Sequence, residues 1–429
     1  MIPSAIMSFS YRNNVFAELI SLYSTWQALK SFLESEEGGS FRVVDQDESD
    51  LCIIRYEKGV SNMNLPHSRW FRSVVWNAET NRPVCISPPK AMSTELPVQT
   101  TQQAIESGLL CQELLDGFMI NCFTLAGEKT LHICSRSKLN ASGRFYSSKS
   151  FRELFIEAHT GRIKQEDESL ESFIQEESQN WDQPDPEKKE IAYGYSFLVQ
   201  HTEHRIVKPI SENRAFLIHK TIAYEDGSVQ FEENHSTFRS RDNLRSIPIG
   251  GADEKITYLQ TWIQTTLEEQ PWTFQGLVVK DKEGNRWRFR SNAYSMVKSL
   301  RGNAAYLLDR FVPLYQRNVV PYYISYYPED QNTMEFYTVF LNHMIQYLHG
   351  LYMDVHVQRT TPIQQIDRMY HPHLYALHGI YLSRKKPITA NDVYEYLRLQ
   401  PWQRIAFLLR NNQDAYTKQL LDSMNNPSV

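Results

Sequence analysis

The chain has 429 residues, a length that allows two or three domains and a large buried core. Its formal net charge is -5, so the chain as a whole lacks the positive charge typical of nucleic-acid-binding proteins, although a local basic surface is compatible with that value. Aromatic residues make up 12% of the sequence, which favours a packed globular protein over a disordered one.

The five cysteines lie mainly in apolar, strand-like runs and include no C-x-x-C pair, so we expect reduced thiols in the core. No apolar run approaches the roughly 20 residues that a membrane helix needs. The first residues also lack the apolar segment of a signal peptide. These features predict a soluble, intracellular protein with no membrane span.

The N-terminal region, residues 1–40, is predicted to hold one helix and a leader. Apolar side chains recur at three- and four-residue spacing over residues 15–33, which indicates an amphipathic helix. A strand at 51–56 then begins a sheet domain, and Lys58 follows it as a strand-end lysine. Residues 111–145 read as two alternating strands joined by a turn at Gly127.

Residues 159–190 are rich in acidic and polar groups and end in prolines. They predict a solvated helix and loop, and an acidic segment that docks onto a partner is the alternative. The remaining elements predicted for the sheet domain are strands at 196–200 and 215–221, a helix at 256–267, and strands at 276–280 and 286–290 joined by a hairpin turn at 283–285. Together they predict an α+β domain at 41–303.

The strand at 286–290 alternates between basic and aromatic residues. Arg286, Arg288 and Arg290 fall on one face of this strand, and Trp287 and Phe289 fall on the other. An arginine row over an apolar core face is the structural interpretation. Because guanidinium groups suit phosphate, the same row is a candidate for binding nucleotide or RNA phosphates.

Residues 304–429 are predicted to form a separate all-α domain. Helical stripes occur near residues 336–352, from Pro387 onward and near 402–409, and the polar tail from Asn411 is expected to fray. The histidines considered as metal ligands here are His343, His349, His356, His371, His373 and His378. Their spacings do not give the i, i+4 pair of a helical zinc site, so core or surface roles are expected and no metal.

Residues 113–118 contain the frame of a nucleotidyl-transfer motif without its nucleophile. Covalent nucleotidyltransferases attack the α-phosphate of a nucleotide with the lysine of a K-x-D-G pattern, in which glycine lets the backbone approach the nucleotide. Asp116 and Gly117 stand two and three places after Leu114. A leucine cannot form a phosphoramidate.

Further segments, in the family's order, make residues 68–300 similar to the RNA ligases of the phage tRNA-repair type. FRSVVW at 71–76 resembles C-R-G-I-M-F, SPPK at 87–90 resembles R-P-M-x-K, and SRSK at 135–138 resembles S-K-G-S. FLVQHTEHRIV at 197–207 is similar to F-E-x-x-x-P-x-N-R-I-V, with Leu198 in place of the glutamate. FQGLVVK at 274–280 and RFRS at 288–291, followed by Tyr294, replace E-G-x-V-x-K and K-x-K-(S/T), with Gln275 in place of the glutamate.

This resemblance implies a nucleotidyltransferase (ATP-grasp-like ligase) mixed-sheet domain. In the family, one lysine takes the nucleotide, two glutamates contact ribose and metal, and paired lysines contact phosphates. Leu114, Leu198 and Gln275 stand at degenerate positions, so no catalytic residue and no metal ligand are expected. The expected remnant of the nucleotide- and phosphate-binding site comprises Arg72, Lys90, Asp116, Gly117, Arg136, Lys138, Arg205, Lys280, Arg288 and Arg290.

Three hypotheses follow from a degenerate site. The first is an inactive RNA-ligase-like protein, a pseudoenzyme reused as a structural component with protein partners in an assembly. By analogy it would be a virion or minor capsid-associated protein of a large DNA virus, located in the host cytoplasm or the virion. The second is a nucleotide- or RNA-binding module of RNA repair or processing. The third is an unconventional ATP-dependent RNA ligase, which alone would need ATP and magnesium and a lysine outside the motif, such as Lys58.

Overall fold

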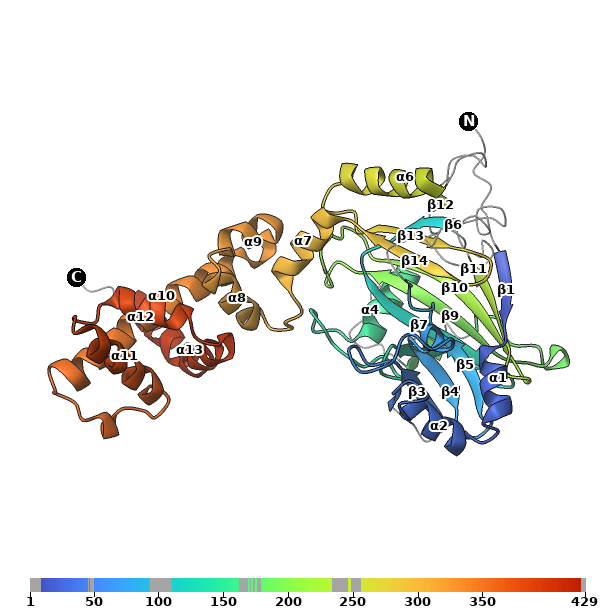
Figure 1. Ribbon diagram of the computed structural model, residues 1–429, viewed down its shortest axis with the longest axis horizontal. Coiled ribbons are helices and arrows are strands. Elements are labelled where there is room, and N and C mark those ends of the chain that lie inside the picture. The colour runs from blue at the N-terminus through green and yellow to red at the C-terminus, as the bar shows by residue number, and fades with distance from the viewer. Residues whose placement is uncertain are drawn as a thin grey trace. The chain divides into compact units, whose positions relative to one another are not determined.

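The computed structural model describes residues 9–44, 46, 50–92, 110–161, 169, 171–172, 174–175, 179–233, 246–247 and 256–425. The chain divides into two compact units, Met1–Met296 and Val297–Val429, where the sequence suggested a boundary at 303/304. Antiparallel sheets with a few helices build the first unit, and helices build the second (Figure 1). An α+β first unit and a helical C-terminal region are therefore confirmed in outline, and the strand pairings described are antiparallel.

The largest sheet of the first unit has six antiparallel strands in the order β1-β11-β10-β9-β7-β8. These strands are β1 (Phe9–Asn13), β7 (Phe118–Leu125), β8 (His132–Ser135), β9 (Glu190–Gln200), β10 (Arg214–Tyr224) and β11 (Val229–Glu233). β7 and β8 form the predicted hairpin, and Gly127 adopts a φ of 82° in its turn, a conformation that favours glycine.

A second sheet has the order β2-β3-β4-β5, and two helices pack on it. Its strands are β2 (Arg42–Val44), β3 (Leu51–Arg55), β4 (Val74–Asn77) and β5 (Arg82–Ile86). The single helix expected at 15–33 is wrong, because the chain forms α1 (Val15–Leu22) and α2 (Trp26–Glu34). Thr25 starts α2 as an N-cap, with its hydroxyl accepting a hydrogen bond from the Ala28 amide.

The third sheet has the order β12-β6-β13-β14. Its strands are β12 (Ser246–Ile247), β6 (Leu110–Glu113), β13 (Gly276–Lys280) and β14 (Arg286–Arg290). The helix α6 (Ile256–Glu269) covers one face and packs Ile263 against Leu277, Val279, Trp287 and Phe289. β6 therefore pairs in a different sheet from β7, although the two strands are neighbours in the sequence.

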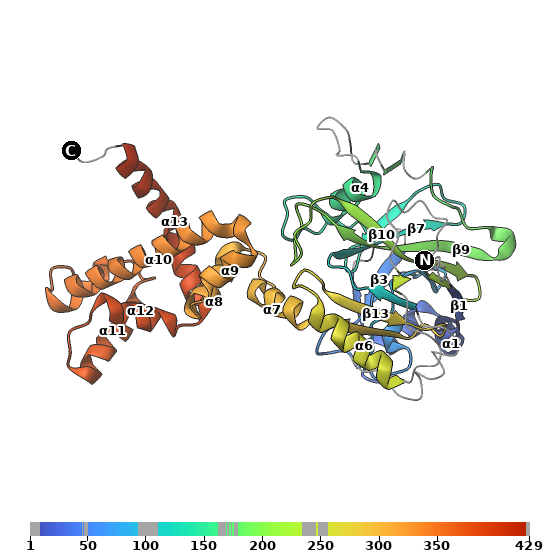
Figure 2. The same cartoon turned by 90° about the horizontal axis from the view of Figure 1, so that it is seen from above.

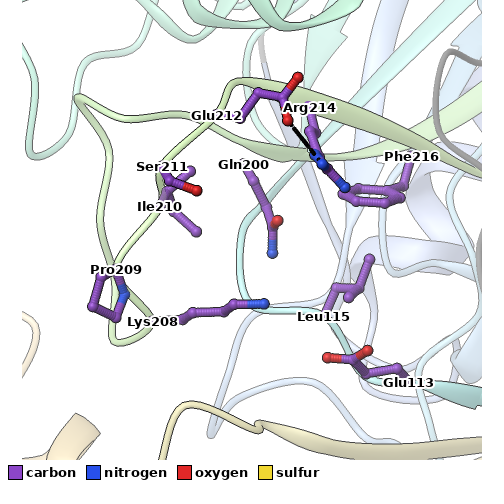
Figure 3. A pocket seen from close by; sticks show the side chains of 10 residues that line it. All are labelled: Glu113, Leu115, Gln200, Lys208, Pro209, Ile210, Ser211, Glu212, Arg214 and Phe216. Atoms are coloured by element: carbon purple, nitrogen blue, oxygen red, sulfur yellow. Dashed lines mark hydrogen bonds and ion pairs between the residues drawn. The ribbon is translucent and has the colours of Figure 1, made fainter.

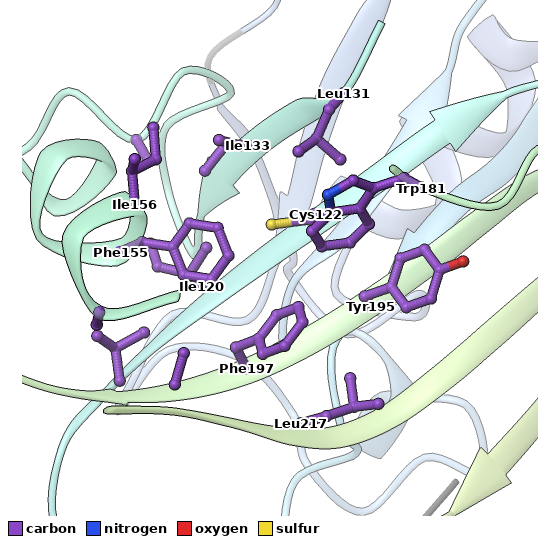
Figure 4. Close-up of a cluster of buried hydrophobic side chains, with 14 of the residues drawn as sticks. Ile120, Cys122, Leu131, Ile133, Phe155, Ile156, Trp181, Tyr195, Phe197 and Leu217 are labelled. Carbon is purple, nitrogen blue, oxygen red and sulfur yellow. The ribbon is translucent and has the colours of Figure 1, made fainter. Parts of the chain in front are cut away.

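The main hydrophobic core of the first unit lies between the six-stranded sheet and α4 (Phe151–Thr160), as Figure 4 shows. The ring of Phe155 of α4 lies 5.3 Å from that of Phe197 of β9, and Ile156 and Tyr195 belong to the same cluster. Burial of such a side chain contributes roughly 1.5–3 kcal/mol. Ser150 begins α4 with a complete capping box. Most of the acidic segment that follows α4, predicted as a solvated helix, lies outside the described residues.

The second unit consists of helices, with α7 (Asn292–Arg301) spanning the boundary. Its other helices are α8 (Leu307–Gln316), α9 (Val320–Tyr326), α10 (Gln331–Tyr352), α11 (His371–Arg384), α12 (Ala390–Arg398) and α13 (Trp402–Asn425). The short helical segments of the whole chain are Ser68–Trp70, Pro186–Lys188, Pro328–Asp330, Met353–Val357 and Ile363–Gln365.

The expectation that the chain frays from Asn411 is wrong, because α13 continues to Asn425 (Figure 2). Tyr416 is buried, and its ring stacks on that of Phe340 with a centroid separation of 4.5 Å, which holds this part of α13 against α10. All five cysteines are buried and free, as predicted. Within the described part of the chain, no helix combines the length and apolar character needed to cross a bilayer.

Candidate functional site

Asp116, the acidic residue of the expected motif, is fully engaged by the protein itself. Its side chain is buried, and its carboxylate accepts hydrogen bonds from the backbone amides of Val207 and Lys208, both at 2.9 Å, and from the Tyr294 hydroxyl at 2.7 Å. These donors come from the loop after β9 and from α7. The carboxylate therefore fixes two distant segments and is not free to hold a metal ion or a nucleotide.

Gly117 is required by close packing of β7 against β9. A Cβ atom at this position would lie 2.3 Å from the Val199 carbonyl oxygen, far inside van der Waals contact. The D-G pair thus has a complete structural explanation, in which the aspartate binds the loop and the glycine admits the neighbouring strand. Its presence alone carries no information about a nucleotide.

The register of the third sheet places the expected site residues on one face. Leu114 follows β6 and donates its amide to the Gly276 carbonyl at 2.8 Å, so it continues the pairing of β6 with β13. Because residues directly opposite each other share a face, Leu114 lies on the same face as Arg288 and Arg290. Trp287 is buried on the opposite face under α6, as the alternation predicted.

Six basic residues and one aromatic ring form a group that we call the basic cluster. Arg72, Lys90, Arg136 and Arg288 lie near Tyr56, and Arg286 and Arg290 join the group through their interactions with Arg72 and Arg288. The Arg136 guanidinium lies 4.6 Å from the centroid of the Tyr56 ring, and the Lys90 ammonium lies 5.3 Å from it. Arg288 is exposed, so solvent reaches the cluster.

The positive charges of the basic cluster are close enough to oppose one another. Burial, followed by the charge of Arg286, lowers the pKa of Arg72 to about 9, and Arg136 and Arg288 act in the same direction. Burial and the neighbouring Arg290 also lower the pKa of Arg288. A guanidinium with so depressed a pKa is destabilised in its charged form, because burial and like charges both disfavour it.

Acidic partners for the basic cluster are missing from the described residues. No carboxylate there lies within ion-pair distance of any of its six basic side chains. The buried Nε atoms of Arg136, Arg286 and Arg290, and Nη1 of Arg286, have no hydrogen-bond acceptor within the described chain. The cluster is therefore a concentration of positive charge with no ion-pair partner in the described residues, and the Glu233 carboxylate acts on Arg286 only from beyond that distance.

Lys280 differs from the cluster although it lies on the same face of the sheet. It is buried and pairs with the Glu233 carboxylate at 2.5 Å. Burial alone would raise the pKa of Glu233, but Lys280 and then His219 overcome this effect and lower it to about 2. This satisfied pair ties β11 of the six-stranded sheet to β13 of the third sheet, so Lys280 has a structural partner.

The other residues expected in the remnant are dispersed. Lys138 is exposed in the turn after β8, and the Arg205 Nε donates to the Val207 carbonyl at 2.9 Å. Leu198 packs with Leu115 against Phe216 of β10. Gln275 is buried directly before β13. The structure thus brings Arg72, Lys90, Arg136, Arg288 and Arg290 together and places Lys138, Arg205 and Lys280 in other surroundings.

A cavity of about 450 Å³ lies beside residues 113–115. Leu115 and Phe216 form apolar lining, while Lys208 and Gln200 point their polar ends toward the interior (Figure 3). The complete lining is Glu113, Leu115, Gln200, Lys208, Pro209, Ile210, Ser211, Glu212, Arg214 and Phe216. No motif predicted this cavity, because most of its lining comes from a loop outside the matched motifs.

The histidines considered in the sequence do not assemble into a metal site within the described chain. His356 and His378 come together, but as rings stacked with centroids 4.2 Å apart. The described residues with ligand-like spacing are Glu157, His201 and Glu203 of the first unit. The Lys149 ammonium bonds to both carboxylates there, at 3.0 and 2.7 Å, so the protein supplies its own cation.

Comparison with protein-family models and with the curated proteins finds no match to this chain. The interpretation of the site therefore depends on its geometry and on the resemblance of the short motifs. Sequence reasoning missed Tyr56, whose role depends on contacts with Arg136 and Lys90 from other segments. It also left Arg286 outside the expected remnant, although the alternation at 286–290 had placed it in the arginine row.

Proposed function

We propose that this chain is a non-catalytic RNA-ligase-like protein that binds the phosphate groups of RNA or a nucleotide through its basic cluster. The observation that carries the proposal is the absence of acidic partners around six basic side chains in the described chain. The sheet-rich first unit is compatible with the nucleotidyltransferase fold that the motifs imply. In that resemblance, the basic residues retained at motif positions contact phosphates.

Electrostatics supports binding of an anion. Unpaired, partly buried charges are costly, and a bound anion that accepts hydrogen bonds from them removes that cost. Guanidinium groups bind phosphate through paired hydrogen bonds, and these charge-assisted bonds are among the strongest in proteins. Arg288 and Arg290 keep this capacity at the positions where the resemblance expects two lysines. The cluster is therefore suited to phosphate.

Catalysis is not supported by the same residues. Leu114 offers no nucleophile, Leu198 and Gln275 offer no negative charge for a metal ion, and Asp116 is saturated with hydrogen bonds from the protein. Phosphoryl transfer depends on preorganised charge around the metal and the phosphates. The cavity beside Leu115 has a mixed lining, in which Leu115 and Phe216 offer apolar surface to the base of a bound nucleotide without any chemical step.

The direct test measures binding of a fluorescent single-stranded RNA, and separately of ATP, to the full chain at low and moderate salt. We expect RNA affinity to fall steeply with salt, and the double variant Arg288→Ala/Arg290→Ala to bind at least about tenfold more weakly. Arg144→Ala is the matched control, because Arg144 is an exposed arginine of the same unit. Equal losses in both variants, or no binding at low salt, would contradict the proposal.

A second experiment addresses the enzyme alternative. The protein is incubated with ATP labelled at the α-phosphate, together with magnesium or manganese, and then separated under denaturing conditions. We expect no labelled band. A labelled band would show covalent catalysis through a lysine outside the motif, and Lys58, which lies in an exposed turn, would be the first residue to map.

The exposed apolar surface of the helical unit favours a second candidate function, a structural component of an assembly. Its exposed large apolar side chains include Tyr306, Tyr322, Val339, Tyr347, Tyr375, Leu399 and Phe407. Such side chains are enriched at protein interfaces. If the protein is a virion or minor capsid-associated component, it will copurify with assembled particles and cross-link to their proteins. Recovery only in the unassembled fraction would exclude this role.

A further inference from the structure

Gln112 is a fully buried polar residue of β6 whose side chain makes no hydrogen bond. Its exposure is 0%, and neither its amide nitrogen nor its amide oxygen has a partner within the described residues. Most buried amides in proteins are paired, because an orphaned one costs free energy. An apolar residue of similar size would avoid that cost, so the amide at this position calls for an explanation.

The register shows what lies around Gln112. Gln112 is directly opposite Val278 of β13, and Val278 is directly opposite Arg288 of β14. All three therefore share one face, with the short valine between two longer polar side chains. Neighbouring strands are about 4.8 Å apart, so the backbones at Gln112 and Arg288 are separated by about 10 Å. Gln112 and Arg288 therefore flank Val278 on this face.

Arg286 lies one alternation further along β14 on the same face. Its Nε and Nη1 atoms are buried without an acceptor in the described chain. The Glu233 carboxylate, which favours the charged form of Arg286, is already paired with Lys280. Arg286 and Gln112 thus offer orphaned hydrogen-bond donors next to Arg288, beyond the pair Arg288 and Arg290.

We propose that Gln112 and Arg286, together with Arg288, form an additional phosphate subsite, so that the cluster binds a chain of linked phosphates rather than one phosphate group. This inference rests on the proposed anion-binding function and names its ligand class, a polyphosphate. The guanidinium of Arg286 supplies paired donors, and the amide nitrogen of Gln112 donates to a phosphate oxygen above Val278. A free polyphosphate and the 5′-triphosphate of an RNA share this chemistry.

The test is isothermal titration of the full chain with orthophosphate, tripolyphosphate, and RNA oligonucleotides that carry either a 5′-triphosphate or a 5′-hydroxyl. For the wild type we expect tripolyphosphate to bind at least about tenfold more tightly than orthophosphate. Preference for the triphosphate RNA over its 5′-hydroxyl counterpart would identify an RNA end as the source. Binding of tripolyphosphate without that preference would identify a free polyphosphate.

The variant Gln112→Leu separates binding from packing. We expect it to bind tripolyphosphate about tenfold more weakly, to bind orthophosphate within about twofold of the wild type, and to melt at the same or a higher temperature, because a buried orphaned amide is removed. Unchanged tripolyphosphate affinity would show that Gln112 is a packing residue and would overturn the inference. Arg144→Ala is again the control.

If Gln112→Leu does not fold, Arg286→Lys decides the question. This variant keeps the positive charge and loses the planar fork, so the subsite predicts a similar selective loss for tripolyphosphate. Sensitivity to Arg288→Ala/Arg290→Ala without sensitivity at Gln112 or Arg286 would overturn the subsite and leave the proposed function standing. No binding of any anion by the wild type would overturn both.

Discussion

Asp116 and five of the six residues of the basic cluster stand at positions compared with the ligase motifs, but only Asp116 has its charge satisfied by hydrogen bonds from the protein. Three donors from the protein surround Asp116. The basic cluster has no carboxylate at ion-pair distance within the described residues. The first arrangement is complete without a ligand, and the second is not. A motif residue therefore indicates a function only when its hydrogen-bonding capacity remains unused.

The largest loss of stability is expected when the hydrogen-bonded carboxylate of Asp116 is removed. Asp116→Ala would leave the buried amides of Val207 and Lys208 and the Tyr294 hydroxyl without an acceptor. We expect the free energy of unfolding to fall by about 3–5 kcal/mol, measured by urea denaturation. Glu79→Ala, which removes an exposed carboxylate, is the control and should change little. A stability close to the wild type would mean that Asp116 is not a structural residue.

The Glu233–Lys280 ion pair predicts that the free energy of unfolding depends on pH. Because the pKa of Glu233 falls from 4.5 to about 2 on folding, its stabilisation is complete above pH 4.5 and is lost as the pH falls toward 2. The amount is about 3 kcal/mol. Urea denaturation between pH 6 and pH 3 should show a shallower pH dependence for Glu233→Gln than for the wild type. Parallel curves would contradict this account.

Anions that bind to the basic cluster should instead stabilise the folded protein. At a tripolyphosphate concentration about 100 times the Kd, we expect the wild type to gain about 2.7 kcal/mol of stability, measured by thermal and urea denaturation. Arg288→Ala/Arg290→Ala should gain much less. Without a ligand, this variant should be at least as stable as the wild type, because like charges have been removed. Strong destabilisation of the ligand-free variant would make these arginines structural and would break the comparison.

The smallest loss of stability is expected at Gly117, where a substitution can distinguish a role in strand packing from a role in ligand binding. Gly117→Ala forces a Cβ atom to within 2.3 Å of the Val199 oxygen, so we expect a loss of about 1–3 kcal/mol with unchanged RNA affinity. Gly143→Ala is a matched control, because its Cβ would meet no atom closer than 3.5 Å. Normal stability with weakened RNA binding would assign Gly117 to the ligand instead.

Local patterns predicted some strands of the first unit and missed β1, β4, β5 and β11. The strands at 276–280 and 286–290 have the expected bounds, because alternation and a turn signal act over neighbouring residues. The break between α1 and α2 was missed, since the apolar spacing continues across it and the N-cap at Thr25 is a weaker signal. The pairing of β6 away from β7 depends on strands far along the chain, which periodicity does not reveal.

The candidate site was predictable in its residues and not in their roles. The arginines of the cluster could be selected from the sequence, but their lack of acidic partners emerges only when Arg72, Arg136 and Arg288 meet in space. Asp116 shows the reverse case, because its partner Tyr294 is 178 residues away in the sequence. Whether the polar atoms of a side chain already have hydrogen-bond partners depends on the tertiary structure. A motif match in the sequence therefore does not predict it.

Residues 114–117 connect two sheets through a link that is fixed at both ends. Leu114 is held to Gly276 through its backbone amide, whereas position 116 needs a carboxylate for its hydrogen bonds and position 117 needs the absence of a Cβ atom. Mutational tolerance should therefore be uneven within these four positions. Leu114 is only partly buried and its hydrogen bond to Gly276 uses the backbone, so position 114 should accept more residue types than positions 116 and 117. A library of random substitutions should retain Asp116 and Gly117 and let position 114 drift.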